Sequence, residues 1–269
     1  MSSKVNRRRF LKYAGAGLVA GAAAIGGYYF YQSSTPAPPA PSGWTYVALG
    51  DSFTGNICGG KSYPDYYADY IESDLGVKVR VLNEWKANFT SDELLSALRG
   101  ESAYGFFRNE VSEAKVVTFM IGAQELVLNP AITDIRKALA PWRETYDAVI
   151  DEILSLRSTS DTIIRAIDYP NPFVSYLKKQ GILDQVKANC AGFVEQFVEA
   201  ASEHNIPLAR VDLAWNGPNL DEDPAAKGYT CGEVGPGQVP ATASIHPTEA
   251  GNRVIAEVLR KLGYKPLGA

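Results

Sequence analysis

Residues 44–56 of the chain, WTYVALGDSFTGN, decide the fold. The first six residues of this stretch are aromatic or aliphatic apart from Thr45, and they lead directly into Gly50, Asp51 and Ser52. This pattern is typical of a buried strand that ends in a tight turn. Ligands bind at the carboxyl edge of an open parallel α/β sheet, so a serine hydroxyl held on that turn can act as a nucleophile. The alternative is that Asp51 and Ser52 only cap the following helix.

A serine nucleophile needs a base, and the chain contains two histidines. His204 follows a helix predicted over residues 182–203, so we expect it to be solvated or to cap that helix. His246 lies in the loop before a predicted amphipathic helix, which Pro247 can open at its first position. An ordinary loop histidine is the alternative. Considered together with Ser52 at the sheet edge, His246 is the candidate base.

Two motifs, GDSFTGN at residues 50–56 and IHPTEAGNRVIA at residues 245–256, are found near the two ends of the region from residue 44 to residue 263. Together they resemble the SGNH (GDSL-type) hydrolase family of serine esterases. The resemblance implies a single-domain, flavodoxin-like three-layer α/β/α sandwich around a mostly parallel five-stranded sheet. It also implies a serine esterase whose four short blocks supply a serine, a glycine, an asparagine and a histidine.

By this resemblance, Ser52 attacks an ester carbonyl, His246 takes its proton, and the backbone N–H of Ser52 is one donor to the oxyanion. The other two donors are the backbone N–H of Asn88 and the side-chain amide of Gln124. Asn88 stands where the family has glycine, and asparagine tolerates glycine-like backbone conformations well. Gln124 stands where the family has asparagine, so it keeps the NH₂ donor and adds one methylene.

A third departure from the family pattern lies three residues before the histidine, where Ala243 replaces the usual aspartate. A backbone carbonyl of Ala243 or Ser244 could orient the imidazole instead, and Asp212 is a remoter substitute. We therefore expect a Ser-His dyad assisted by a backbone carbonyl. The three departures also motivate an alternative from another class, a catalytically weak or inactive binding module that keeps the same fold.

The rest of the chain alternates between strand and helix patterns, which predicts a parallel sheet with helices on both of its faces. The longest predicted helix has a break or bend near Pro141. Strands are predicted over residues 44–49, 77–83, 115–122, 162–170 and 207–214, and helices over residues 62–76, 90–98, 131–157, 182–203 and from 247 onward.

Residues 1–31 contain consecutive arginines followed by a Gly/Ala-rich apolar run over residues 13–31. This segment resembles a twin-arginine export signal. The alternative is an amino-terminal membrane anchor, since about twenty apolar residues can span a bilayer. Residues 32–43, QSSTPAPPAPSG, form a Pro/Ser/Ala linker, and residues 44–269 form the catalytic domain. Both interpretations predict an extracytoplasmic domain, either secreted or tethered to the membrane.

Charge and motifs limit the ligands that the domain could bind. The formal charge is −4, and without the five positive charges of residues 1–43 the remainder carries −9. An acidic domain does not favour nucleic acid as a partner. We expect no cofactor and no metal, because no nucleotide-binding fingerprint follows the first strand and the acidic run at residues 221–223 is typical of a solvated loop. The expected partner is an ester-bearing small molecule, lipid or acylated glycan, bound by a monomer.

A long loop over residues 215–244 is predicted to form a wall of the substrate pocket, because unstructured connections of that length are uncommon without a function. Four aromatic side chains near this edge could line an acyl pocket or form a platform for a sugar. They are Phe173, Tyr176, Trp215 and Tyr229.

The chain has three cysteines, which in an exported protein suggests one disulfide and one remaining thiol. We favour a bridge between Cys190, in a predicted helix, and Cys231, in the loop ahead of His246. Such a bridge would hold the loop that carries the histidine. A bridge between Cys58 and Cys231 stays open, because both residues are predicted at the active-site edge.

Overall fold

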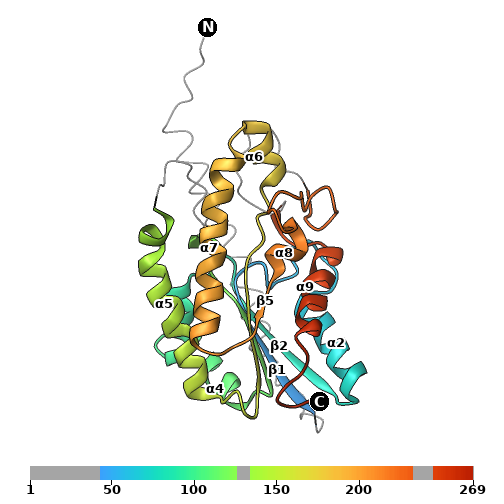
Figure 1. Cartoon of the computed structure of the whole chain (residues 1–269). Coiled ribbons are helices and arrows are strands. Elements are labelled where there is room, and N and C mark those ends of the chain that lie inside the picture. Colours follow the sequence, from blue (N-terminus) through green and yellow to red (C-terminus); the bar gives the residue numbers. More distant parts are fainter. Residues whose placement is uncertain (1–42, 126–133, 233–244, 269) are drawn as a thin grey trace, which may run out of the picture. The chain divides into compact units, whose positions relative to one another are not determined.

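The computed structural model of the chain describes residues 43–125, 134–232 and 245–268. Five strands in this part of the chain form one parallel sheet in the order β2-β1-β3-β4-β5 (Figure 1). This arrangement confirms the predicted α/β fold. The strands are β1 (Trp44–Gly50), β2 (Val79–Trp85), β3 (Val116–Met120), β4 (Ile163–Ile167) and β5 (Leu208–Ala209).

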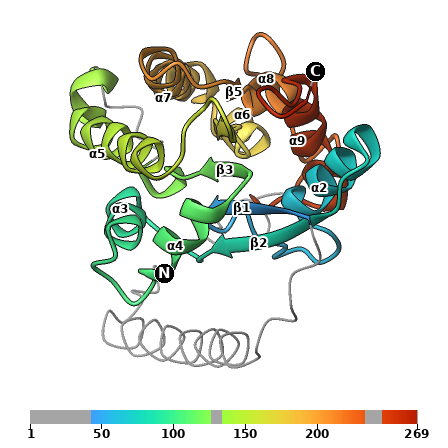
Figure 2. The same ribbon diagram turned by 90° about the horizontal axis from the view of Figure 1, so that it is seen from below.

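Helices cover both faces of the sheet, as Figure 2 shows in a view from below. One face carries α2 and α9, which contact each other, and the other face carries α3, α4, α5 and α7. The three layers of the predicted sandwich are therefore present. The helices are α2 (Tyr63–Leu75), α3 (Ser91–Arg99), α4 (Phe106–Glu113), α5 (Ile135–Leu156), α6 (Val174–Gln180), α7 (Leu183–Glu203), α8 (Val211–Asn216) and α9 (Glu249–Lys261), with a 3-10 turn η1 (Ala123–Glu125).

Helix ends follow from local sequence where capping residues are present. The hydroxyl of Thr90 accepts a hydrogen bond from the N–H of Glu93, and the Glu93 carboxylate accepts one from the N–H of Thr90, so α3 begins with a capping box. Gly76 and Gly100 end α2 and α3 in the left-handed conformation that glycine adopts readily. Pro141 lies inside α5, and the helix continues through it, so of the predicted break or bend at this position the break is absent.

The last predicted strand, over residues 207–214, is wrong over most of its length. β5 contains only two residues, and the chain turns into α8 at Val211. The buried carboxylate of Asp168 explains the turn, because its Oδ1 accepts hydrogen bonds from the N–H groups of Val211 (2.7 Å) and Asp212 (3.0 Å). A carboxylate that satisfies the first N–H groups of a helix favours helix over strand at that point.

The strand register makes β1, β2 and β3 end at the same height at the carboxyl edge of the sheet. Gly50 at the end of β1 is paired with Trp85 of β2 and with Met120 of β3. The segments that follow these three strands therefore start side by side at one edge, which is where ligands bind in this class of sheet.

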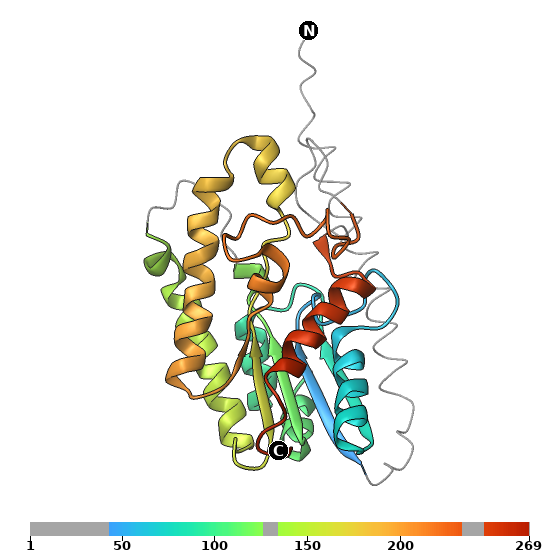
Figure 3. The same cartoon turned by 45° about the vertical axis from the view of Figure 1, so that its right-hand side comes forward.

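The first and last helices of the domain are joined directly. α9 lies beside α2 in Figure 3, and the N–H of Tyr63 donates to Oδ1 of the buried Asn252 (3.0 Å). Gly251 is needed at the start of α9, because a Cβ there would lie 2.3 Å from the carbonyl oxygen of Tyr229 and 2.9 Å from the indole of Trp215. The contact places the motif near the end of the domain next to the motif near its start.

Two carboxyl groups, Glu84 on β2 and Glu110 on α4, are partly removed from water. Burial raises the pKa of Glu84 to about 7, and burial together with the nearby Glu84 raises the pKa of Glu110 to about 8. In the folded protein these groups keep their protons at pH values where an unfolded chain has lost them. The stabilising protonated state is therefore fully present below the unfolded pKa of about 4.3 and is lost as the pH rises through the folded pKa values.

We expect Glu110→Gln to reduce this loss of stability, because glutamine stays neutral at every pH. Between pH 6 and pH 9 the free energy of unfolding should fall by less in the variant than in the wild type, by a difference of the order of 1 kcal/mol. Denaturant unfolding at the two pH values measures it. Glu257→Gln, at an exposed position of α9, is the control and should behave as the wild type. An equal fall in all three proteins would contradict the prediction.

Candidate active site

The serine turn begins where β1 ends. A Cβ at Gly50 would lie 2.2 Å from Oγ1 of Thr54 and 2.4 Å from the carbonyl oxygen of Met120, so the turn requires glycine at this position. The N–H of Asp51 then donates to the carbonyl of Met120 (3.3 Å). Ser52 follows at the carboxyl edge with 7% of its surface exposed. The turn thus holds Ser52 next to the end of β3.

His246 reaches the same turn from the far end of the domain. Its Nε2 lies 2.8 Å from Oγ of Ser52, although the two residues are 194 positions apart. The imidazole is 8% exposed, and its centroid lies 5.7 Å from that of the Phe53 ring. The structure therefore brings together the two residues that the sequence analysis paired, at a distance that allows proton transfer.

The backbone around His246 is held by the segment at residues 229–231. The N–H of Cys231 donates to the carbonyl of His246 (3.1 Å), and the N–H of Thr248 donates to the carbonyl of Tyr229 (2.9 Å). The first bond is made by the histidine itself and the second by the residue two positions after it. They fix the starting point of its side chain, as a hydrogen-bonded base requires.

The predicted disulfide between Cys190 and Cys231 is wrong, because the structure joins Cys58 to Cys231 with 5.9 Å between their Cα atoms. Cys190 is a free thiol on α7, buried in a small apolar cluster with Phe173 and Leu177. Burial raises the pKa of the Cys190 thiol to about 12. The pairing that the sequence left open is thus the one present, since Cys58 follows the serine turn and Cys231 contacts the histidine loop.

Asp51 holds several segments of this edge together. Its side chain is fully buried and accepts hydrogen bonds from the N–H of Phe53 (2.9 Å), the N–H of Ala123 (3.3 Å) and the hydroxyl of Tyr169 (2.5 Å). The sequence suggests only a turn or capping role for Asp51, and Tyr169 was not predicted at this site. The available signal was the position of Tyr169 at the carboxyl end of a predicted strand, which places it near the same edge.

Asn88 lies in a turn beside the end of β1. Its φ angle is 60°, the left-handed conformation that favours glycine and that asparagine tolerates. The N–H of Phe89 donates to the carbonyl of Lys86 (3.2 Å), and the N–H of Lys86 donates to the carbonyl of Gly50 (3.1 Å). The glycine-like conformation expected at Asn88 is confirmed, and its turn is bonded to the strand that precedes Ser52.

Gln124 lies in η1, the short 3-10 turn at the end of β3. Its side chain is exposed, and the preceding residue, Ala123, donates its N–H to the carboxylate of Asp51. Gln124 is therefore one residue away from a direct bond to the serine turn. This places an exposed amide donor at the same edge as Ser52 and Asn88.

The four aromatic residues expected in the pocket occupy different positions. Trp215 is fully buried in the main core, packed against Phe53 and Tyr229, so it cannot line an open pocket. Phe173 is buried in the small cluster around Cys190, with Tyr176 packed against that cluster. Trp215 departs from the expectation, because sequence marks an aromatic residue near an edge and does not say which side of it faces the core. Tyr176 and Tyr229 are half-buried, and their place in a pocket stays a prediction.

Asp212, the remoter substitute for the missing triad aspartate, forms an ion pair at the start of α8. Both of its carboxylate oxygens accept hydrogen bonds from Arg210, at 2.9 and 2.8 Å. A carboxylate held in this way by a guanidinium is less available to a second partner. Ala243 and Ser244 lie outside the described residues. The group that orients His246 therefore stays a prediction.

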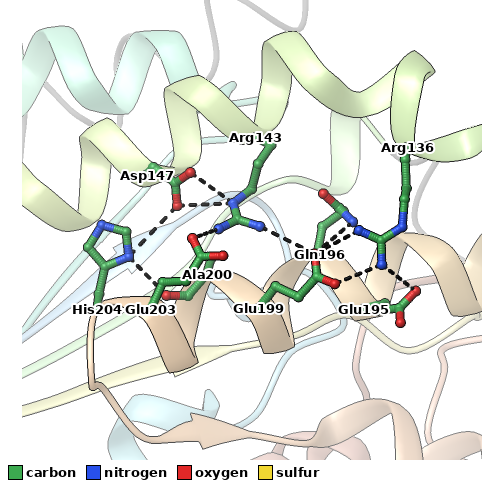
Figure 4. A network of polar contacts seen from close by, with 9 residues as sticks. All are labelled: Arg136, Arg143, Asp147, Glu195, Gln196, Glu199, Ala200, Glu203 and His204. Carbon is green, nitrogen blue, oxygen red and sulfur yellow. Dashed lines mark hydrogen bonds and ion pairs between the residues drawn. The ribbon is translucent and has the colours of Figure 1, made fainter.

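His204 lies away from the serine, at the end of α7. Figure 4 shows it in a network of charged side chains between α5 and α7. Its Nδ1 lies 2.9 Å from the carbonyl oxygen of Ala200, and its ring nitrogens lie 3.8 Å from Asp147 and 3.2 Å from Asp151. The capping role expected for His204 is confirmed, which leaves His246 as the histidine of the candidate site.

The described residues show neither a metal site nor a membrane span. Within residues 43–125, 134–232 and 245–268, no group of three or more His, Cys, Asp or Glu residues could hold a metal ion. No helix of the same ranges is both long enough and apolar enough to cross a membrane.

Comparison with family models connects these motifs to known proteins. A model of the GDSL-like lipase/acylhydrolase family matches residues 48–254, which include both Ser52 and His246. The chain belongs to this family. As a GDSL-like lipase/acylhydrolase it is a carboxylic ester hydrolase, in agreement with the resemblance that the two sequence motifs indicated. No protein of curated function matched the sequence.

Solved structures share the fold of this GDSL-like chain. The lipase Lip_vut3 from a goat rumen metagenome is 20% identical, with a TM-score of 0.65 over 83% of this chain and 99% of its own. A catalytic mutant of Axe2, an acetylxylan esterase from Geobacillus stearothermophilus, is 18% identical, with a TM-score of 0.57 over 83% and 96%. A lipase/acylhydrolase from Enterococcus faecalis is 18% identical, with a TM-score of 0.54 over 82% and 95%. These likenesses confirm the fold class.

The disulfide of this GDSL-like protein predicts a definite number of free thiols. In denaturant without reductant, a thiol reagent should detect one thiol in the wild type, none in Cys190→Ala and two in Cys58→Ala. Loss of the bridge in Cys58→Ala should also lower the free energy of unfolding by about 2–5 kcal/mol. Cys190→Ala keeps the bridge, so it is the control: its free energy of unfolding should fall when a reductant is added, as that of the wild type does. A wild type with three reactive thiols before reduction would contradict the structure.

Proposed function

We propose that this protein is a serine esterase that uses Ser52 and His246 as a catalytic dyad. The observation that carries the proposal is the 2.8 Å contact between Oγ of Ser52 and Nε2 of His246 at the carboxyl edge of the sheet. A serine hydroxyl in hydrogen-bond contact with an imidazole is the arrangement that activates a nucleophile. The buried turn and the backbone bonds around the histidine keep the two groups in this geometry.

The reaction follows from the positions of these groups. Oγ of Ser52 attacks the ester carbonyl carbon while Nε2 of His246 takes the hydroxyl proton, and the same proton then passes to the leaving alcohol. Water hydrolyses the acyl-enzyme, with His246 again acting as the base. The negative charge on the carbonyl oxygen is stabilised by the backbone N–H groups of Ser52 and Asn88 and by the amide of Gln124.

The orientation of the imidazole is assigned to the loop ahead of it. A backbone carbonyl of Ala243 or Ser244 orients the ring in this proposal, because Asp212 is engaged by Arg210. A carbonyl oxygen can accept the second ring N–H and so select the tautomer in which Nε2 accepts the serine proton. The dyad then works without a third carboxylate.

The proposed substrates are acyl esters of lipids or glycans. An acetylxylan esterase and lipases have the same fold, and this supports an ester substrate of either kind. A series of esters of increasing acyl length on one alcohol separates the two, because a lipolytic enzyme prefers longer acyl chains and an O-deacetylase accepts acetyl. Activity on acetylated xylan with no activity on long-chain esters would assign the glycan.

We further infer that the domain works outside the cytoplasm. The disulfide between Cys58 and Cys231 supports this location, since such bonds persist in oxidising compartments. Residues 1–31 are proposed to direct export, residues 13–31 to act as a tether if they are retained, and residues 32–43 to link them to the domain. These segments lie outside the described residues.

Ser52→Ala should abolish hydrolysis of short p-nitrophenyl esters, with a fall in kcat of at least about 10³-fold, because it removes the nucleophile. Labelling by a fluorophosphonate should disappear with it. Ser112→Ala, at an exposed serine of α4, is the matched control and should keep both. A folded wild type that neither turns over esters nor becomes labelled would instead support the catalytically weak binding module.

Gln124→Ala should lower kcat by about 10²-fold while KM changes little, because an oxyanion donor acts mainly in the transition state. Steady-state kinetics on one ester measures both constants. Gln180→Ala, at an exposed glutamine of α6, controls for loss of a surface amide. An unchanged kcat in Gln124→Ala would remove this residue from the oxyanion hole and leave the role to backbone donors.

A further inference from the structure

The starting observation is the buried carboxylate of Asp51, the residue before Ser52. Its Oδ1 accepts the N–H of Phe53 in the serine turn, and its Oδ2 accepts the N–H of Ala123 in η1 and the hydroxyl of Tyr169. These donors come from segments that follow β1, β3 and β4. Ala123 precedes Gln124, so one carboxylate is bonded to both the nucleophile turn and the turn of the proposed oxyanion donor.

Tyr169 is held rigidly at this position. It is 3% exposed, and its ring packs edge-on against Phe53 with 5.5 Å between centroids and against Phe197 of α7 at 6.0 Å. The Phe53 ring in turn lies 5.7 Å from the imidazole of His246. Packing on both sides fixes the direction of the phenol ring. The hydroxyl is therefore already placed to donate to Asp51, at 2.5 Å.

A buried carboxylate keeps its place only while its oxygens are hydrogen-bonded. The bond from Tyr169 is charge-assisted, and such bonds are the stronger ones. If the hydroxyl is removed, Oδ2 of Asp51 loses a short donor and moves toward the partners that remain. The N–H groups of Phe53 and Ala123 move with it, and these groups adjoin Ser52 and Gln124. A displacement of about 1 Å at a catalytic group can lower the rate by about 10²-fold.

We propose that Tyr169 is a positioning residue for ester hydrolysis, which sets the relative placement of Ser52 and η1 through its hydrogen bond to Asp51. The inference rests on the proposed function, because it concerns the reaction at Ser52. Tyr169 takes no proton and touches no substrate in this role. It acts on the geometry of the oxyanion hole, so its loss should reduce the rate of the chemical step more than substrate binding.

Tyr46 provides a matched control within the same sheet. Its hydroxyl is also fully buried and hydrogen-bonded, at 2.8 Å from Oγ1 of Thr118. Neither Tyr46 nor Thr118 adjoins Ser52 in the chain. Tyr46→Phe and Tyr169→Phe therefore remove equivalent buried hydroxyls, and only the second removes one from Asp51.

The experiment compares kcat and KM for the wild type, Tyr169→Phe and Tyr46→Phe on one p-nitrophenyl ester, with kcat referred to the Ser52 sites titrated by a fluorophosphonate at completion. Titration counts folded sites, so partial unfolding does not imitate a slow enzyme. We expect kcat to fall at least tenfold in Tyr169→Phe with KM within twofold, and both constants to stay within twofold in Tyr46→Phe. The inference would be overturned if kcat and KM were the same in the two variants, or if Tyr169→Phe changed KM and left kcat unaltered.

A double-mutant cycle with Asp51→Asn tests whether the effect passes through Asp51. If it does, Tyr169→Phe should lower kcat by no more than twofold in the Asp51→Asn background, because the coupled group is already altered. If the losses of kcat in Tyr169→Phe and Asp51→Asn multiplied in the double variant, Tyr169 would not act through Asp51. An inert wild type would overturn the proposed function together with this inference, whereas an active, Ser52-dependent wild type with an unaffected Tyr169→Phe overturns the inference alone.

Discussion

The carboxyl group of Asp51, buried beside the proposed nucleophile, is the constraint on which this edge of the sheet depends. Asp51 is fully buried, and a carboxylate in that position is stable only when donors surround it. The chain supplies them from the serine turn, from η1 and from the end of β4. Because one carboxyl group accepts a hydrogen bond from each of these three segments, it fixes their positions relative to one another. The level strand ends make this possible, because Gly50 and Met120 are paired directly.

The second constraint joins the start of the domain to its end. Asn252 of α9 accepts the N–H of Tyr63, and a disulfide connects Cys58 with Cys231. Both links lie close to the Ser52–His246 contact, and each connects the region after the serine with the region around the histidine. The base is thus held by covalent and hydrogen-bonded attachments as well as by its own bond to the serine. Rigid support of this kind suits the proposed Ser-His dyad.

Sequence predicted the features that depend on local pattern. The strand before Gly50, the helix that starts near Thr90 and the loop position of His246 all follow from neighbouring residues. Features that depend on distant partners were missed or mistaken. The bond between Asp51 and Tyr169 spans 118 positions, the end of β5 depends on the buried Asp168, and the disulfide depends on which face of α7 carries Cys190. None of these can be read from residues near them in the chain.

The separation of 194 positions between Ser52 and His246 has a consequence for biosynthesis. A nascent chain acquires the proposed nucleophile among the first residues of its domain and the proposed base among the last. A product that stops before residue 246 keeps the residues of the serine turn and of all five strands, and it lacks the histidine. If the two residues act as proposed, such a truncated copy is hydrolytically silent.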